Sequence, residues 1–159
     1  MLKNILIASL SLTLVLCTKE EFPSFDIFHA NCVVQVTYPS QSCQQTHINL
    51  ERTIRSFNPE PDAKGIYAVK ESLPQDYIWA TRTTPVQRYV DDIIFEVEQK
   101  GEDCVVKAKS RSQTFSIYDF ETNYCNIYNV HRYIGGFQDI KTEQCRFKPT
   151  DPDSRCKIY

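Results

Sequence analysis

Five polar residues in the second half of the sequence have side chains that could form a small binding site. Two carboxylates, two hydroxyls and an amide together supply both donors and acceptors of hydrogen bonds. We interpret them as a pocket for a polar or anionic group. The alternative is a structural role, in which they cap a helix and anchor a loop. The candidate residues are Asp91, Ser110, Ser112, Asp119 and Asn123.

A predicted β-hairpin would bring the first three of these residues together. Two segments that alternate apolar and polar side chains, 89–99 and 102–113, are separated only by a short turn that contains glycine. Pairing their inner ends puts the apolar side chains of both segments on one face and places Asp91 opposite Ser110. A carboxylate on a buried face needs hydrogen-bond partners, and Ser110 and Ser112 are on that face.

The other two candidates, Asp119 and Asn123, lie where a helix is predicted to begin. Apolar residues at helical spacing occupy 124–134, and Gly135-Gly136 follows as a typical helix end. Backbone N–H groups at the start of a helix lack partners within the helix. That end can therefore bind a polar or anionic ligand, or be capped by the two side chains themselves.

Further elements are predicted on either side of the first helix. A strand over 32–38 precedes a helix that begins at Ser42, with Gln45 completing a capping box. Short strands over 66–69 and 77–83 follow, and short turns between neighbours favour antiparallel pairing. We predict an α+β fold, with an antiparallel sheet of about four to five strands and two helices packed on one face.

The cysteines indicate that disulfides stabilise this fold. Cys17 belongs to the predicted leader, and the other six are at least eleven residues apart. Because close Cys-x-x-Cys pairs are absent, we expect disulfides, in a pairing that the sequence leaves open, and neither a metal nor another cofactor. We expect at least one of the last two cysteines to pin the polar C-terminal tail. The predicted disulfide cysteines are Cys32, Cys43, Cys104, Cys125, Cys145 and Cys156.

The N-terminal residues predict export. Lys3 precedes an apolar run over 5–16, which is too short to span a bilayer and is typical of a signal peptide. We therefore predict a signal peptide over residues 1–17 and a single secreted or lumenal domain over 18–159, with no transmembrane segment. The scattered charges, with a formal net charge of −2, argue against a nucleic-acid partner.

Several motifs resemble the domain-of-unknown-function 1499 family. Residues 89–95, Tyr-Val-Asp-Asp-Ile-Ile-Phe, are similar to its Phe-Val-Asp-Asp-Val-Glu-Phe strand, and 106–112 to its strand rich in Arg and Ser. Residues 119–124 resemble its Asp-x-Gly-x-Asn-Arg helix start, with Glu121 in place of the glycine and one extra residue in the preceding loop. The resemblance covers 78–134. It implies a remote, secreted relative with the same fold, and no particular reaction.

These features favour a non-catalytic binding domain whose ligand is a protein, a glycan or a lipid. One alternative is a small hydrolase that uses Ser112, His131 and Asp119, although no Gly-x-Ser-x-Gly elbow surrounds any serine. Another is a carrier of a lipid or other apolar ligand in a cleft between helices and sheet. Tyr77 and Trp79 alternate along a strand, so they either form an exposed contact face or are covered by the helices or the tail.

Overall fold

The computed structural model describes residues 19–159, so the predicted signal peptide, residues 1–17, lies outside the described part of the chain. Within that part the chain forms a six-stranded antiparallel sheet and three α-helices. In chain order the elements are a 3-10 turn η1 (Lys19–Glu21), β1 (Asn31–Tyr38), α1 (Cys43–Ser56), β2 (Ile66–Leu73), β3 (Tyr77–Thr83), β4 (Val90–Lys100), β5 (Asp103–Ser112), α2 (Thr122–Ile134), β6 (Gln138–Glu143) and α3 (Pro152–Arg155).

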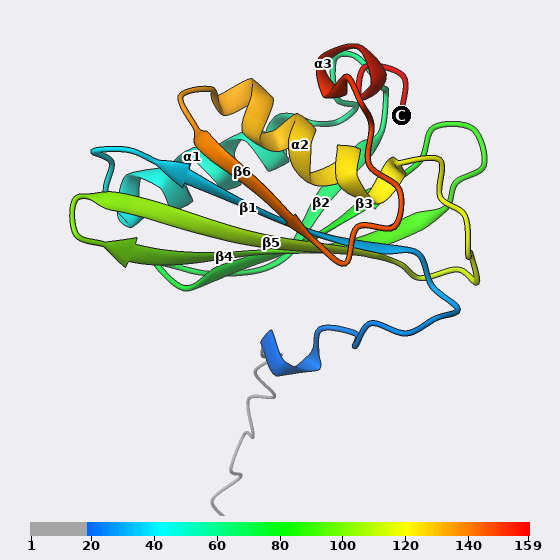
Figure 1. Ribbon diagram of the computed structural model, residues 1–159, viewed down its shortest axis with the longest axis horizontal. Helices are drawn as coiled ribbons and strands as arrows, with labels where there is room; N and C mark the ends of the chain where they lie inside the picture. The colour runs from blue at the N-terminus through cyan, green and yellow to red at the C-terminus, as the bar shows by residue number, and fades with distance from the viewer. Residues whose placement is uncertain (1–18) are drawn as a thin grey trace, which may run out of the picture.

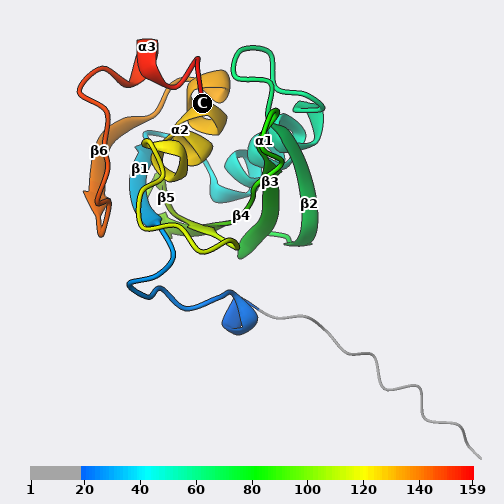
Figure 2. The ribbon, with the colours of Figure 1, turned by 90° about the vertical axis from the view of Figure 1, so that its right-hand side faces the viewer.

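The helices and the sheet form two layers. The strand order is β2-β3-β4-β5-β1-β6, and every neighbouring pair is antiparallel. Figure 2 shows α1 and α2 side by side against one face of the sheet, with the short α3 beyond α2. The predicted α+β class and antiparallel sheet are confirmed. Within the described residues, however, there are six strands rather than four to five, and a third helix.

The extra strand, β6, lies in the C-terminal segment that we predicted to be a polar tail. It pairs with β1 at the edge of the sheet, and five of its six residues are exposed. Since neither of its faces is buried, the sequence carries no alternation of apolar and polar residues to mark it. Cys145 follows β6 and is bonded to Cys32 in β1, which holds this edge strand in place.

Helix α1 begins where its cap predicts. The Ser42 hydroxyl accepts a hydrogen bond from the Gln45 backbone N–H at 3.2 Å. The predicted capping box is only half formed, because the Gln45 side chain donates to Asn49 instead of returning to the cap. Leu50 and Ile54 of this helix are fully buried against the sheet.

The hairpin of β4 and β5 forms with a register two residues away from the predicted one. Asp91 lies opposite Ser112 rather than Ser110. A shift of two residues leaves every side chain on its predicted face, so the apolar side chains still point toward the helices. The turn explains the difference. Gly101 has a φ of +63° at the first central position of a two-residue loop, as a type II′ turn requires.

The six predicted cysteines form three disulfides. One ties β1 to the segment after β6, one ties α1 to β5, and one ties α2 to the C-terminal segment. Cys145 and Cys156, the two cysteines of the C-terminal tail, are therefore both bridged. Each disulfide typically stabilises a fold by about 2–4 kcal/mol. Disulfides of this kind are typical of proteins in oxidising compartments. The pairs are Cys32–Cys145, Cys43–Cys104 and Cys125–Cys156.

The face of the sheet away from α1 and α2 is partly covered by the N-terminal segment, which Figure 1 shows below the strands. There Tyr77 and Trp79 are buried together with Ile94, and Phe22 packs edge-on against Trp79 at 5.6 Å. The two strand aromatics are therefore buried, but the segment that covers them precedes β1 and is neither the helices nor the C-terminal tail that we expected. In residues 19–159, no helix has the length and apolar character needed to cross a bilayer.

Candidate functional site

The structure brings together all five polar residues that the sequence singled out. The Ser112 hydroxyl donates to Asp91 Oδ1 at 2.7 Å, linking β5 to β4. The Ser110 hydroxyl donates to Asn123 Oδ1 at 2.7 Å, linking β5 to α2. The Asn123 amide in turn donates to Asp119 Oδ2 at 2.8 Å. Each of these side chains is at most 9% exposed, so the bonds are shielded from water.

Asn126 is a sixth member that the sequence analysis missed. Its amide nitrogen donates to Asp91 Oδ2 at 2.8 Å and to the Ser110 hydroxyl at 3.1 Å. Asn123 and Asn126 are three residues apart and therefore share one helix face. This spacing of two asparagines within a predicted helix was the feature of the sequence that could have indicated Asn126 as a partner of Asn123. We call these six residues the polar cluster: Asp91, Ser110, Ser112, Asp119, Asn123 and Asn126.

A buried ion pair, also missed by the sequence analysis, lies behind the polar cluster. Arg82 of β3 pairs with Asp91 across the sheet, and its Nη2 donates to Glu60 Oε1 at 3.0 Å. The side chains of Arg82 and Glu60 are each 1% exposed. The only signal in the sequence was that Arg82 continues the buried face of Ile78 and Ala80.

Burial is the largest influence on the pKa of two carboxyl groups in this region, those of Asp91 and Glu60. It raises the pKa of Asp91, and the hydrogen bonds from Ser112 and Asn126 together with the Arg82 charge oppose that rise. It also raises the pKa of Glu60, and the guanidinium of Arg82 opposes that rise as well. For both carboxyls burial is the largest influence on the pKa, and the neighbouring donors and the Arg82 cation only counter it.

The start of α2 is set by Asp119. Its Oδ2 accepts from the Asn123 backbone N–H at 2.9 Å, and its Oδ1 accepts from the Glu121 N–H at 3.2 Å. Asp119 therefore has the capping role that we predicted as the structural alternative. Glu121, which stands where the resembling family pattern has glycine, has a φ of +73° in the left-handed region that glycine favours.

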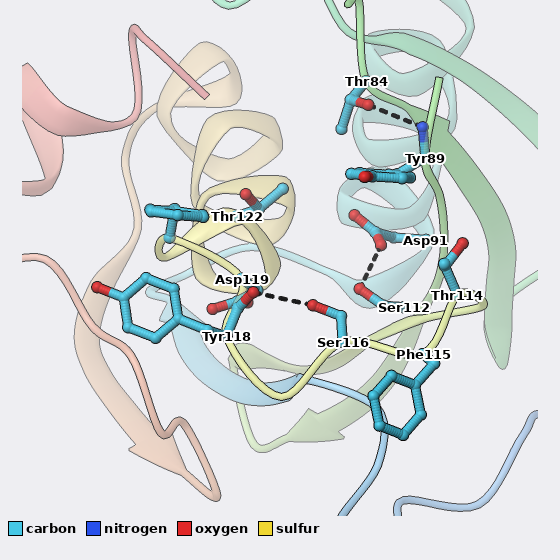
Figure 3. Close-up of a pocket in the computed structure, with 11 residues that line it drawn as sticks. Thr84, Tyr89, Asp91, Ser112, Thr114, Phe115, Ser116, Tyr118, Asp119 and Thr122 are labelled. Carbon is cyan, nitrogen blue, oxygen red and sulfur yellow. Dashed lines mark hydrogen bonds between the residues drawn. The ribbon is translucent and has the colours of Figure 1, made fainter. Parts of the chain in front are cut away.

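An open pocket of about 240 Å³ lies beside the polar cluster. Asp91, Ser112 and Asp119 form its floor, and Figure 3 shows the two carboxyl groups on facing sides of it. Four aromatic side chains line its rim, and each is more than half exposed. They are Tyr89, Phe115, Tyr118 and Phe120.

The predicted hydrolase triad does not assemble. His131 lies eight residues after Asn123, which is about 12 Å further along α2. There it is fully buried, its Nδ1 is 2.9 Å from the Tyr38 hydroxyl, and burial lowers its pKa to about 3. Ser112 donates to Asp91 instead. Across residues 19–159, no group of three or more His, Cys, Asp or Glu side chains could hold a metal ion.

The fold and the site together define a small α+β protein, held by disulfides, with a polar cluster between helix and sheet. The sequence model of the family described as "Protein of unknown function (DUF1499)" matches residues 23–132, and the chain belongs to this family. The match is wider than the 78–134 segment of the resemblance and includes β1, α1 and the whole polar cluster. No curated protein matches the chain at a significant level.

Proposed function

We propose that this chain is a secreted or lumenal binding domain without catalytic activity, and that its ligand occupies the pocket above Asp91 and Asp119. One observation carries the proposal. The floor of the pocket is a buried network of polar side chains, and its rim is made of exposed aromatic rings. The predicted signal peptide and the three disulfides support the location outside the cytosol.

The floor is held rigidly before any ligand arrives. Asp91 receives one hydrogen bond from a strand and one from a helix, so both of its oxygens are fixed in position. Asp119 is fixed in the same way by two backbone N–H groups. Preorganised polar groups at the base of a pocket lower the ordering cost of binding, which favours a recognition role.

The rim supports the same role. Exposed aromatic side chains that gather around a concavity are typical of binding sites, because they offer a large apolar contact at little cost in side-chain entropy. Phe115 and Phe120 are 66% and 56% exposed. Within the described part of the chain, no histidine, cysteine or lysine lines this pocket, so it lacks the usual pairs of nucleophile and base.

Chemical-shift mapping tests the proposal. The ¹⁵N-labelled protein, residues 18–159 with its disulfides formed, would be screened against a library of small polar and amphipathic molecules. We expect at least one compound to shift the amides of residues 84–91 and 112–122. Thr114→Trp, which places an indole at the exposed mouth of the pocket, should abolish those shifts. Gln44→Trp, on an exposed position of α1, should leave them unchanged.

The screen can also contradict the proposal. If no compound shifts the pocket amides, or if every hit binds equally well to the Thr114→Trp variant, the pocket is not the ligand site. A ligand that co-purifies with protein from its natural source and maps elsewhere on the surface would have the same consequence.

A further inference from the structure

Exposed apolar side chains gather at one end of the molecule. There the segment before β1 meets the loop between β5 and α2, because β1 begins beside the end of β5. Figure 1 shows both toward the right-hand end of the sheet. Of the thirteen large apolar side chains that are exposed within residues 19–159, six lie in these two segments, and none lies in the turns at the opposite end of the sheet. We call the six residues the apolar end: Ile27, Phe28, Phe115, Ile117, Tyr118 and Phe120.

Backbone hydrogen bonds hold the two segments of the apolar end together. The N–H of Ala30 donates to the carbonyl of Ser116 at 2.6 Å, and the N–H of Ser116 donates to the carbonyl of Phe28 at 3.0 Å. The rings of Phe28 and Phe115 stack across the join, with 6.0 Å between their centroids. The apolar end is therefore a fixed surface, and its exposure does not come from a loosely packed loop.

The side chains of this surface project into solvent from separate loops. Ile27 is 77% exposed, and Val86 of the β3–β4 loop is 82% exposed. That loop adjoins the apolar end, since its Tyr89 lines the same pocket as Phe115. A protein partner would need a matching hollow for each protruding side chain, whereas the boundary between headgroups and acyl chains in a bilayer accepts them in any outline. The shape of the surface thus favours a lipid partner.

The acidic groups near the apolar end are already engaged. Arg111 Nη2 lies 2.8 Å from Asp26 Oδ2, and Arg155 Nε lies 2.5 Å from Glu121 Oε2. Asp119 is buried and caps α2. This end of the molecule therefore presents little negative charge to an approaching surface.

The basic groups, in contrast, remain open to solvent. Arg88, Arg146 and Lys148 are exposed, and none has a carboxylate partner in the described part of the chain. Arg146 borders a groove that Ile27 and Ile117 also line. Basic side chains beside an apolar patch are the pattern that a membrane surface with anionic lipids complements, because insertion and charge attraction then act together.

We propose that the apolar end docks on a membrane surface that contains anionic lipids. Ile27, Phe28 and Phe115 would enter the boundary between headgroups and acyl chains, and the three basic side chains would lie among the headgroups. This goes beyond the proposed function, because it concerns a surface and needs no ligand in the pocket. Ile27 and Arg146 do not line that pocket, so they can be changed without altering it.

Binding to vesicles tests the proposal. The protein, residues 18–159 with its disulfides formed, would be sedimented with vesicles of three parts phosphatidylcholine to one part phosphatidylserine, and with vesicles of phosphatidylcholine alone. We expect saturable binding to the mixed vesicles, at least about fivefold weaker binding to the neutral ones, and weaker binding to the mixed vesicles at high salt. The proposal is wrong if the protein binds to neither.

NMR in bicelles of the same mixed lipids locates the bound surface. A nitroxide-labelled lipid should broaden the amides of residues 26–28 and 115–118, which would lie against the bilayer. The amides of residues 100–103, at the opposite end of the sheet, should stay sharp. Broadening that is strongest away from the apolar end would assign docking to another face and overturn the proposal.

Variants separate insertion from charge. Ile27→Ser should weaken binding to both kinds of vesicle by at least about fivefold, because an aliphatic side chain no longer leaves water. Arg146→Gln should weaken binding by about fivefold on the mixed vesicles only. Leu73→Ser and Lys100→Gln are matched controls, since both positions are exposed at the opposite end of the sheet, and they should change neither affinity. Controls that act as strongly as Ile27→Ser and Arg146→Gln would show that the apolar end is not the docking surface.

The outcomes also separate this proposal from other partners and from the pocket. If vesicles do not bind and the protein forms dimers that Ile27→Ser abolishes, the apolar end is a contact between copies and the membrane proposal is wrong. If vesicles bind as expected but no library compound reaches the pocket, the proposed pocket ligand fails and the docking surface stands. A compound that maps to the pocket of a protein without vesicle binding would give the reverse result.

Discussion

Replacing Arg82 with methionine should destabilise the fold far more than an ordinary loss of an ion pair. Arg82 and Glu60 are each 1% exposed, so the substitution leaves a carboxylate buried without its cation. Breaking a buried pair on one side typically costs about 3–5 kcal/mol of the free energy of unfolding. Small domains are stable by about 5–15 kcal/mol, so this loss would remove a large part of the total.

A matched control comes from the exposed pair of Arg55 and Glu51. Its N–O distance of 2.6 Å is shorter than the 3.0 Å of the buried pair, and the Arg55 side chain is 58% exposed. Exposed pairs one helical turn apart contribute about 0.3–0.5 kcal/mol. If distance alone decided the effect, Arg55→Met would be the more harmful change. Because burial decides it, Arg82→Met should cost several times more.

The pH dependence supplies a second test of the same reasoning. In Arg82→Met the opposing charge is gone, so burial should hold the pKa of Glu60 even further above its unfolded value of about 4.5. A carboxyl with a raised folded pKa favours the folded state when it is protonated, and this contribution is lost as the pH rises above the unfolded pKa. The variant should therefore be closest to the natural protein near pH 4 and furthest from it near pH 7.

Urea denaturation with the disulfides intact measures these effects. The unfolding free energies of the natural protein, Arg82→Met, Glu60→Gln and the double variant would be compared from pH 4 to pH 8. The double variant should recover much of the loss, since it removes the uncompensated charge. A cost of Arg82→Met below about 1 kcal/mol at pH 7, or a cost that does not change with pH, would show that burial does not decide the contribution of this ion pair.

Three further predictions concern neighbouring residues. Gly65→Ala should lower the free energy of unfolding by about 1–3 kcal/mol, because the added Cβ would lie 2.3 Å from the buried Arg82 Nε. An unchanged melting temperature would contradict this close packing of Gly65 on Arg82. Asn126→Leu removes a donor from the buried carboxylate of Asp91 and should cost about 1–3 kcal/mol in the same assay, whereas a neutral effect would show that water or a rearranged donor replaces it. His131, whose pKa is about 3, should show no titration of its imidazole NMR signals between pH 5 and pH 8, and its contribution to stability should be lost as the pH falls from about 6.5 toward 3.

Local signals in the sequence were enough to predict most of the elements. Ser42 marks the start of α1, and the alternation around Gly101 marks the hairpin, because caps and turns depend on residues close together in the chain. The hairpin also brought Asp91 near its serines despite the wrong register, since a shift of two residues preserves the faces. The β6 strand was missed because an exposed edge strand has no buried face to leave a pattern.

The buried ion pair could not be predicted in the same way. Glu60 lies in a polar loop after α1, where a charged residue is ordinarily solvated. Only the folded chain brings that loop over β3, so that Glu60 meets Arg82. Asn126 was missed for a related reason, since an amide on a helix is usually exposed. Its burial follows from how closely α2 packs on the sheet.

The two parts of the site have different origins in the sequence. The residues of the floor, including Asp91 and Asp119, fall within the motifs by which the chain resembles its family. The rim residues Phe115 and Tyr118 lie in the loop between Ser112 and Asp119, where this chain has one residue more than the family pattern. A buried polar network of this kind is seldom more stable than an apolar core of the same volume, so stability alone does not account for it. We therefore expect relatives to share the floor and to differ in the loop. Transplanting residues 113–118 into such a relative should transfer binding of the compounds that map to this pocket, and a chimaera that folds without gaining it would assign recognition to the floor alone.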